Sequence, residues 1–133
     1  MVVKKINKTQ QQWREELDDE TFRVTRCQGT ERPFSGQYNE HFAAGDYVCT
    51  CCGNRLFLSQ DKFPTSCGWP SFSAAIPQSI ESHDDYSMRG IHRVEVTCSV
   101  CEAHLGHVFD DGPAPTGLRY CINSVALQFI PNH

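Results

Sequence analysis

Hydrophobic and polar positions change their spacing along the chain, from a helical pattern near the start to a strand pattern further on. Trp13 and Leu17 lie four residues apart on one helical face, and Thr9 and Gln12 before them form a capping-box pattern. These residues predict a helix that begins after Thr9. The acidic run 18–20 ends this helix or begins a second one, and the segment 21–27 fits either a helix or a strand.

From residue 47 onward apolar positions alternate with polar ones, or β-forming residues predominate, as in strands. Val94, Val96 and Cys98, for example, share one face of an extended segment. We expect strands over 47–50, 55–58, 91–98 and 118–130. Glycine, proline and small polar residues predict loops and turns at 29–36, 44–46, 62–79 and 110–117.

The length of 133 residues has room for one domain. We expect a mainly β fold over 1–133, mostly antiparallel, with a helical part at about 9–27 and a β core at about 46–130. No internal repeat or linker divides it.

Composition and charge exclude several classes of protein. The net charge of -4 has the wrong sign for a protein that binds nucleic acid through its phosphates. No apolar run is long enough for a membrane helix, and residues 1–8 lack the apolar stretch of an export signal. We therefore expect a cytoplasmic protein, in which most of the eight cysteines stay reduced.

Two C-x-x-C pairs, Cys49 with Cys52 and Cys98 with Cys101, have the spacing of zinc ligands. Together they predict one structural zinc ion held by four thiolates, which would join two hairpins distant in sequence. Alternatives remain open at this point. Cys51 could replace Cys52, a single pair could be a redox motif, and buried thiols could simply fill the core.

A local site of a different kind is a further alternative at the second pair. Cys98 and Cys101 are followed by His104 and His107, so two cysteines and two histidines could hold the metal. Only two residues separate Cys101 from His104, which makes that geometry cramped.

Cys121 has no partner at metal spacing, and its neighbours suggest chemistry. Arg119, Cys121 and Asn123 project from one face if this segment is a strand, and a guanidinium beside a thiol favours the thiolate. A hairpin centred on the loop 110–117 would bring His107 opposite Cys121, where it could supply a proton. The opposing interpretation is a core cysteine beside a solvent-facing arginine.

Cys67 lies in a loop beside Trp69, which has a flat apolar face suited to a methyl or thioether group. A loop thiol could resolve an oxidised intermediate on another cysteine. The indole could equally fill an edge of the core.

Three motifs in one order resemble the methionine-R-sulfoxide reductases of the B class. They are Cys67-Gly-Trp-Pro-Ser-Phe72, His104-Leu-Gly-His-Val-Phe109 and Arg119-Tyr-Cys-Ile-Asn-Ser124, together with both cysteine pairs and Gly29-Thr-Glu-Arg-Pro-Phe34. The resemblance extends from about Trp13 to about Ile130.

This resemblance implies a fold of two antiparallel β sheets with N-terminal helices and a four-cysteine zinc site away from the active site. It implies reduction of methionine-R-sulfoxide, in proteins and as the free amino acid, with thioredoxin as the reductant. Cys121 would be the nucleophile, Cys67 the resolving thiol and Trp69 the contact of the substrate methyl group. The polar side of the site would consist of His104, His107, Arg119 and Asn123.

Cys27 and Cys51 are not part of this family pattern. A protein-binding module related to zinc ribbons, without catalysis, is the alternative function. A zinc hydrolase is disfavoured, because four protein sulfurs leave no open position for water.

Overall fold

Two short helices open the part of the chain described by the computed structural model, which covers residues 5–132. The prediction that residues 1–8 lack an export signal falls partly on residues 1–4, which lie outside that part. Helix α1 (Gln10–Glu16) confirms the predicted capping box, since Thr9 and Gln12 each accept a hydrogen bond from the backbone amide of the other. Helix α2 (Asp19–Arg26) begins at the Asp18 cap, so the ambiguous segment is helical up to Arg26. Neither helix is long and apolar enough to cross a membrane.

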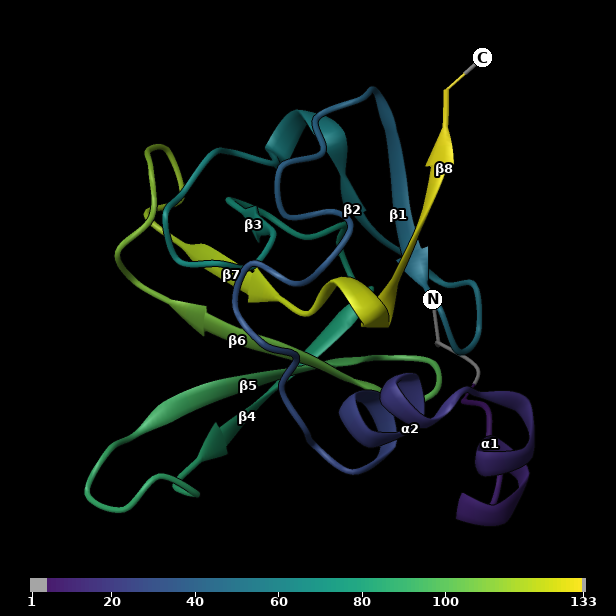
Figure 1. Ribbon diagram of the computed structural model, residues 1–133. Helices are drawn as coiled ribbons and strands as arrows, with labels where there is room; N and C mark the ends of the chain where they lie inside the picture. The colour runs from purple at the N-terminus through teal and green to yellow at the C-terminus, as the bar shows by residue number, and fades with distance from the viewer. Residues whose placement is uncertain (1–4, 133) are drawn as a thin grey trace.

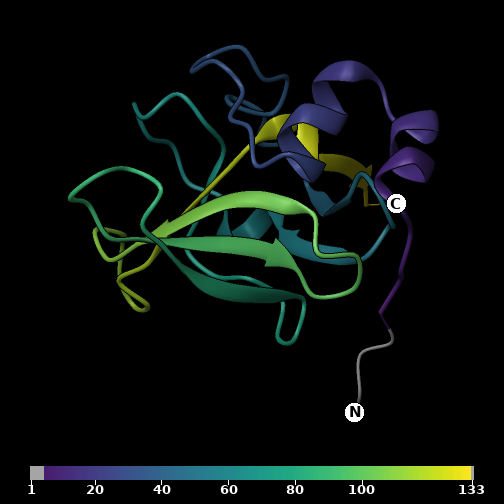
Figure 2. The same ribbon diagram turned by 90° about the horizontal axis from the view of Figure 1, so that it is seen from below.

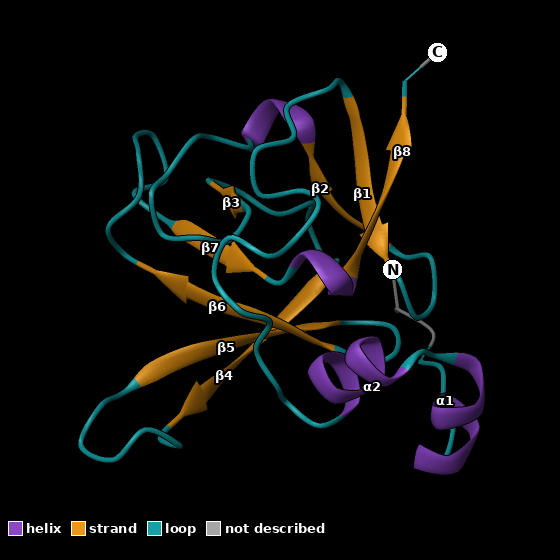
Figure 3. Ribbon diagram, viewed as in Figure 1, coloured by secondary structure: helices purple, strands orange, loops and turns teal. Residues whose placement is uncertain are grey.

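Within residues 5–132, eight strands form two antiparallel sheets, as predicted (Figures 1 and 3). The three-stranded sheet has the order β2-β1-β8, and the five-stranded sheet has the order β3-β7-β6-β5-β4. The strands are β1 (Gly45–Cys49), β2 (Arg55–Leu58), β3 (Ser71–Phe72), β4 (Ile80–Asp85), β5 (Arg93–Cys98), β6 (His104–Phe109), β7 (Arg119–Ile122) and β8 (Leu127–Pro131). The 3-10 turns η1 (Ser59–Asp61) and η2 (Ser124–Ala126) complete the elements. The two helices lie to one side of the sheets, and α2 contacts β6 and η2 (Figure 2).

Aromatic side chains join the two sheets in the core. The Phe57 ring of β2 stacks on the Phe72 ring of β3 at 4.4 Å between centroids, and the Tyr47 ring of β1 meets Phe72 edge-on at 5.2 Å. All three residues are fully buried. Burial of a side chain of this size stabilises the fold by about 1.5–3 kcal/mol, and these contacts fix the short strand β3 beside β7.

The predicted elements differ from the observed ones in four places. Gly45 and Asp46, expected in a turn, begin β1 because they pair with the end of β8. The loop 62–79 contains the two-residue strand β3. The expected strand 118–130 is broken by η2, where the chain passes from the larger sheet to the smaller one. Strand β4 was not predicted, because its mostly polar residues suit only an edge strand.

Candidate functional site

Cys121 lies in the middle of β7, between β3 on one side and β6 on the other. Its backbone is paired with Ser71 and with His107, which confirms the register predicted from the loop 110–117. A cavity of about 90 Å³ adjoins the side chain. Its lining consists of Thr30, Trp69, Arg93, Gly106, His107, Phe109, Cys121 and Asn123.

Gly106 allows the close approach of β6 and β7 at this cavity. A Cβ atom at position 106 would collide with the backbone carbonyl of Cys121. A glycine is therefore required for the strand pairing that places Cys121 beside His107.

Cys67 brings a second thiol to the site from the loop before β3. Its Sγ lies 3.9 Å from the Sγ of Cys121, and both thiols are free. Gly68 turns the chain directly afterwards with φ +99°, and its carbonyl accepts a hydrogen bond from the Phe34 amide at 2.7 Å. Because a disulfide needs about 2 Å between the sulfurs, a modest movement of this loop would join them.

The pKa values of the two thiols are shifted in opposite directions. Burial raises the pKa of Cys121 to about 12, with further contributions from the charge and hydrogen bond of Cys67. Burial also acts to raise the pKa of Cys67, but hydrogen bonds from Ser71, Thr65 and other neighbours outweigh it and lower that pKa below the ordinary value. The resting form of Cys121 is therefore a protonated thiol.

Arg119 lowers the pKa of Cys121 in the predicted direction, but burial has the larger effect. The guanidinium lies over the Phe109 ring at 4.5 Å, and it donates to both carboxylate oxygens of Asp111, at 2.9 and 3.2 Å. The effect of Arg119 on the thiol thus has the expected direction, and burial outweighs it in this state. Asp111 therefore holds the Arg119 guanidinium against the Phe109 ring, which lines the cavity.

Trp69 and Asn123 are fixed through the backbone of one residue, Glu31. The indole Nε1 donates to the Glu31 carbonyl at 3.1 Å, and the Glu31 amide donates to Oδ1 of Asn123 at 3.0 Å. Asn123 also donates to the Leu105 carbonyl at 3.0 Å. The Glu31 side chain is itself buried and accepts from the Val125 amide at 3.1 Å. The loop containing Glu31 therefore positions both predicted site residues.

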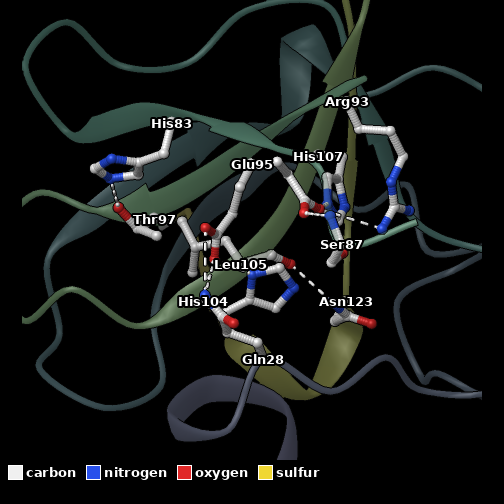
Figure 4. A network of polar contacts seen from close by, with 11 residues as sticks. Gln28, His83, Ser87, Arg93, Glu95, Thr97, His104, Leu105, His107 and Asn123 are labelled. Carbon is white, nitrogen blue, oxygen red and sulfur yellow. Dashed lines mark hydrogen bonds and ion pairs between the residues drawn. The ribbon is translucent and has the colours of Figure 1, made fainter. Parts of the chain in front are cut away.

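His104 and His107 each bind a carboxylate, as Figure 4 shows for part of this network. His107 Nε2 lies 2.7 Å from Oδ2 of Asp85, and His104 Nδ1 lies 2.7 Å from Oε2 of Glu95. The two rings meet edge-on at 5.5 Å between centroids.

A bulge in β6 brings both histidines to one side of the sheet. Gly106 pairs with Val96 and His104 with Thr97, so Leu105 is the extra residue. His107 lines the cavity beside Cys121. His104 is not part of that lining and borders a second cavity instead. Burial lowers the pKa of His104, against the opposing effect of Glu95.

The four predicted zinc ligands form a separate cluster. The Sγ atoms of Cys49, Cys52, Cys98 and Cys101 all lie within 4.8 Å of one another. Two of these pairs, Cys49 with Cys101 and Cys52 with Cys98, are 3.6 Å apart. Sulfurs around a tetrahedral zinc ion with bonds of about 2.3 Å are separated by about 3.8 Å, so the donor set fits this metal.

The cluster decides between the alternatives left open by the sequence. Cys52 rather than Cys51 completes the set of four, and His104 and His107 bind carboxylates instead. Cys49 ends β1 in the smaller sheet and Cys98 ends β5 in the larger one. A bound metal would therefore connect the two sheets.

Sequence reasoning missed the residues that hold the site residues: Glu31, through its backbone, and the carboxylates of Asp85, Glu95 and Asp111. Asp85 lies on the unpredicted strand β4, so its approach to His107 could not be deduced. The contact between Asp111 and Arg119 could have been predicted from the sequence. The hairpin that places His107 opposite Cys121 also brings the two ends of the loop 110–117 together.

The molecule thus combines a thiol pair at a small cavity with a separate cluster of four thiols that fits a metal ion. The family described as the SelR domain matches residues 17–131, and the chain belongs to this family of methionine sulfoxide reductases of the B class. Curated relatives carry the name peptide methionine sulfoxide reductase MsrB. One from Pseudomonas putida (strain W619) is 56% identical over 131 residues, covering 97% of each chain. Another, from Hahella chejuensis, is 52% identical over 125 residues, covering 94% of this chain and 90% of that one.

Among solved structures, the fold is similar to the crystal structure of the Mis18 'Yippee-like' domain. The TM-score is 0.54 at 17% identity, covering 68% of this chain and 98% of the other. This similarity concerns the fold alone.

Proposed function

We propose that this protein reduces methionine-R-sulfoxide in oxidised proteins, and the free amino acid as well, to methionine. Cys121 is the nucleophile and Cys67 the resolving thiol. The observation that carries the proposal is the Cys67–Cys121 pair, 3.9 Å apart, at a cavity lined by Trp69 and His107 in a chain of this family.

The substrate would enter the cavity with its methyl group against the Trp69 ring and its sulfoxide oxygen toward His107. Trp69 and Phe109 supply the apolar part of the lining, while Asn123 and His107 supply polar atoms. The oxygen is a hydrogen-bond acceptor and the methyl group is apolar, so these two sides, together with the direction in which the rest of the methionine leaves the cavity, would distinguish the epimers at sulfur.

The first step forms a sulfenic acid. The Cys121 sulfur attacks the sulfoxide sulfur, and the oxygen passes to Cys121 as methionine leaves. The proton of the resting Cys121 thiol ends on the transferred oxygen, with His107 as the group that relays it. The high pKa of Cys121 before substrate binding agrees with this proton balance, because the thiol holds the proton that the oxygen needs.

The second step forms a disulfide. The Cys67 sulfur attacks the Cys121 sulfenic acid, a Cys67–Cys121 bond forms, and water leaves. A dithiol reductant of the thioredoxin type then exchanges with this disulfide and restores both thiols. The lowered pKa of Cys67 favours its role as the attacking thiolate.

Zinc is the metal that we propose for the four-cysteine cluster, as a structural ion without a part in the reaction. Arg26 and Asn54 donate hydrogen bonds to the cluster sulfurs of Cys101 and Cys98, at 3.4 and 3.6 Å. Such donors stabilise thiolate ligands. Metal analysis should find about one zinc ion per chain, and Cys98→Ser should lose the ion together with fold stability. A metal-free chain of full stability would contradict the assignment.

The reducing cytoplasm is the compartment that we propose, because the reaction requires free thiols and a dithiol reductant. The described cysteines are all free.

Separated R and S epimers of a methionine sulfoxide peptide test the proposal directly. With thioredoxin and its recycling system, the wild type should reduce only the R epimer. Cys121→Ser should lose all activity, and Cys67→Ser should complete one turnover without cycling. Exposed Cys27, mutated to serine, is the control and should leave the rate unchanged. A non-catalytic binding module would reduce neither epimer.

A further inference from the structure

Asp85 binds three groups at the end of β4, at the edge of the proposed active site. One carboxylate oxygen lies 2.7 Å from Nε2 of His107 and 3.2 Å from a guanidinium nitrogen of Arg93, and the other accepts from the Ser87 amide at 2.8 Å. The Asp85 side chain is 16% exposed and that of His107 is 12% exposed. The carboxylate is therefore fixed by several hydrogen bonds, and both side chains of the Asp85–His107 pair are largely shielded from solvent.

The neighbouring residue forms a similar pair in a different setting. Asp84 Oδ1 lies 2.8 Å from Nε2 of His92, but these side chains are 70% and 50% exposed. Two adjacent aspartates thus each bind a histidine, one at the cavity and one on the surface. An exposed pair of this kind has little influence on its histidine, because water competes for both partners.

The bond to Asp85 determines which nitrogen of His107 carries the proton. An ionised carboxylate only accepts hydrogen bonds, so Nε2 must be the donor. The Ser87 hydrogen bonds, followed by His107, keep the pKa of Asp85 below its ordinary value, which maintains that ionised form. In the neutral ring the free nitrogen is then Nδ1, and in the charged ring Nδ1–H is the proton available for transfer.

We propose that Asp85 is the positioning residue of His107, which holds the ring in one tautomer and directs Nδ1 toward the substrate oxygen. This inference rests on the proposed function. His107 gives its Nδ1 proton to the sulfoxide oxygen as Cys121 attacks the sulfur, and it regains a proton from the Cys121 thiol. The net proton transfer is the same as in the first step described above, because one proton leaves the Cys121 thiol and one reaches the sulfoxide oxygen.

Other charged groups near His107 have to be separated from Asp85 in any test. Arg93 of β5 contacts the same carboxylate, and His104 of β6 lies against the His107 ring with Glu95 as its own partner. Because the Asp85 carboxylate contacts Nε2 of His107, its removal should change which ring nitrogen carries the proton, and loss of the Arg93 cation should not.

Nitrogen NMR of the histidine rings in the reduced, substrate-free protein tests the contact itself. In the wild type, His107 should carry its proton on Nε2. In Asp85→Asn, the tautomer of His107 should become mixed. Asp84→Asn is the matched control and should change His92 alone.

Turnover measurements on the same proteins test the consequence. Asp85→Asn should reduce kcat by about tenfold to about a hundredfold with little change in KM, because it would weaken, without removing, a general acid whose full contribution is about 10²–10⁴-fold. Asp85→Glu, which restores the carboxylate, should recover part of the loss, and Asp84→Asn should match the wild type.

Two results would overturn the inference. One is a wild-type His107 that carries its proton on Nδ1, a measurement that does not depend on any variant folding. The other is an Asp85→Asn protein that loses turnover while its His107 signals stay those of the wild type, which would assign the loss to the turn at Ser87. If no protein reduces methionine sulfoxide, the proposed function fails, while the NMR result still decides whether Asp85 controls His107.

Discussion

Asn123 connects the stability of the fold to the geometry of the site, and its removal should affect both. The residue is 3% exposed, and its side chain accepts from the Glu31 amide and donates to the Leu105 carbonyl, each at 3.0 Å. Asn123→Ala would leave the Glu31 amide buried without an acceptor. The Leu105 carbonyl would keep one partner, the backbone amide of residue 123 at 2.9 Å.

The expected cost follows from these two bonds. An orphaned buried donor costs about 1–3 kcal/mol, and the lost bond to Leu105, whose carbonyl stays paired, costs about 1 kcal/mol. Asn123→Ala should therefore lower the free energy of unfolding by about 2–4 kcal/mol. Because the Glu31 carbonyl holds the Trp69 indole, kcat/KM for a methionine-R-sulfoxide peptide should fall as well.

Urea unfolding under reducing conditions, followed by tryptophan fluorescence, measures the first effect as a shift of the midpoint at unchanged slope. Asn132→Ala, at an exposed position, is the control and should stay within about 0.5 kcal/mol of the wild type. A loss below about 1 kcal/mol in Asn123→Ala would refute the reasoning, since it would mean that water or another group satisfies the Glu31 amide.

Two further predictions concern other parts of the fold. Gly106→Ala should force β7 away from β6, because the new methyl group would collide with the Cys121 carbonyl. Thermal unfolding should then occur at a lower temperature, and turnover should fall. An unchanged turnover rate would contradict the strand geometry. Burial lowers the pKa of Lys62 to about 8 from 10.5. Between these pH values the unfolded chain binds more protons, so this residue makes stability rise with pH. The unfolding free energy of Lys62→Met minus that of the wild type should therefore decline from pH 8 to 10.5. A difference that stays constant over this range would contradict the lowered pKa of Lys62.

The sequence predicted those parts of the site that depend on local patterns. The symmetric loop 110–117 was sufficient to place His107 opposite Cys121, and the C-x-x-C spacing identified all four members of the sulfur cluster. The capping box at Thr9 fixed the start of α1. Each of these features is decided by residues close in sequence or by one hairpin.

The parts that depend on contacts between distant segments were not predictable in this way. Asp85 reaches His107 only because β4 pairs with β5 at the sheet edge, and polar residues gave β4 no strand signal. Glu31 holds Trp69 and Asn123 across separations of 38 and 92 residues. The pKa of Cys121 depended on its burial, which the neighbouring Arg119 did not reveal.

The most direct test of the account is the bond formed after one turnover without reductant. The reduced protein is mixed with one equivalent of a methionine-R-sulfoxide peptide, blocked with an alkylating agent, digested and mapped by mass spectrometry. The account predicts one methionine peptide and one Cys67–Cys121 disulfide per chain, with the other described cysteines unpaired. Methionine formed without that disulfide, or a disulfide that joins any other pair, would contradict it.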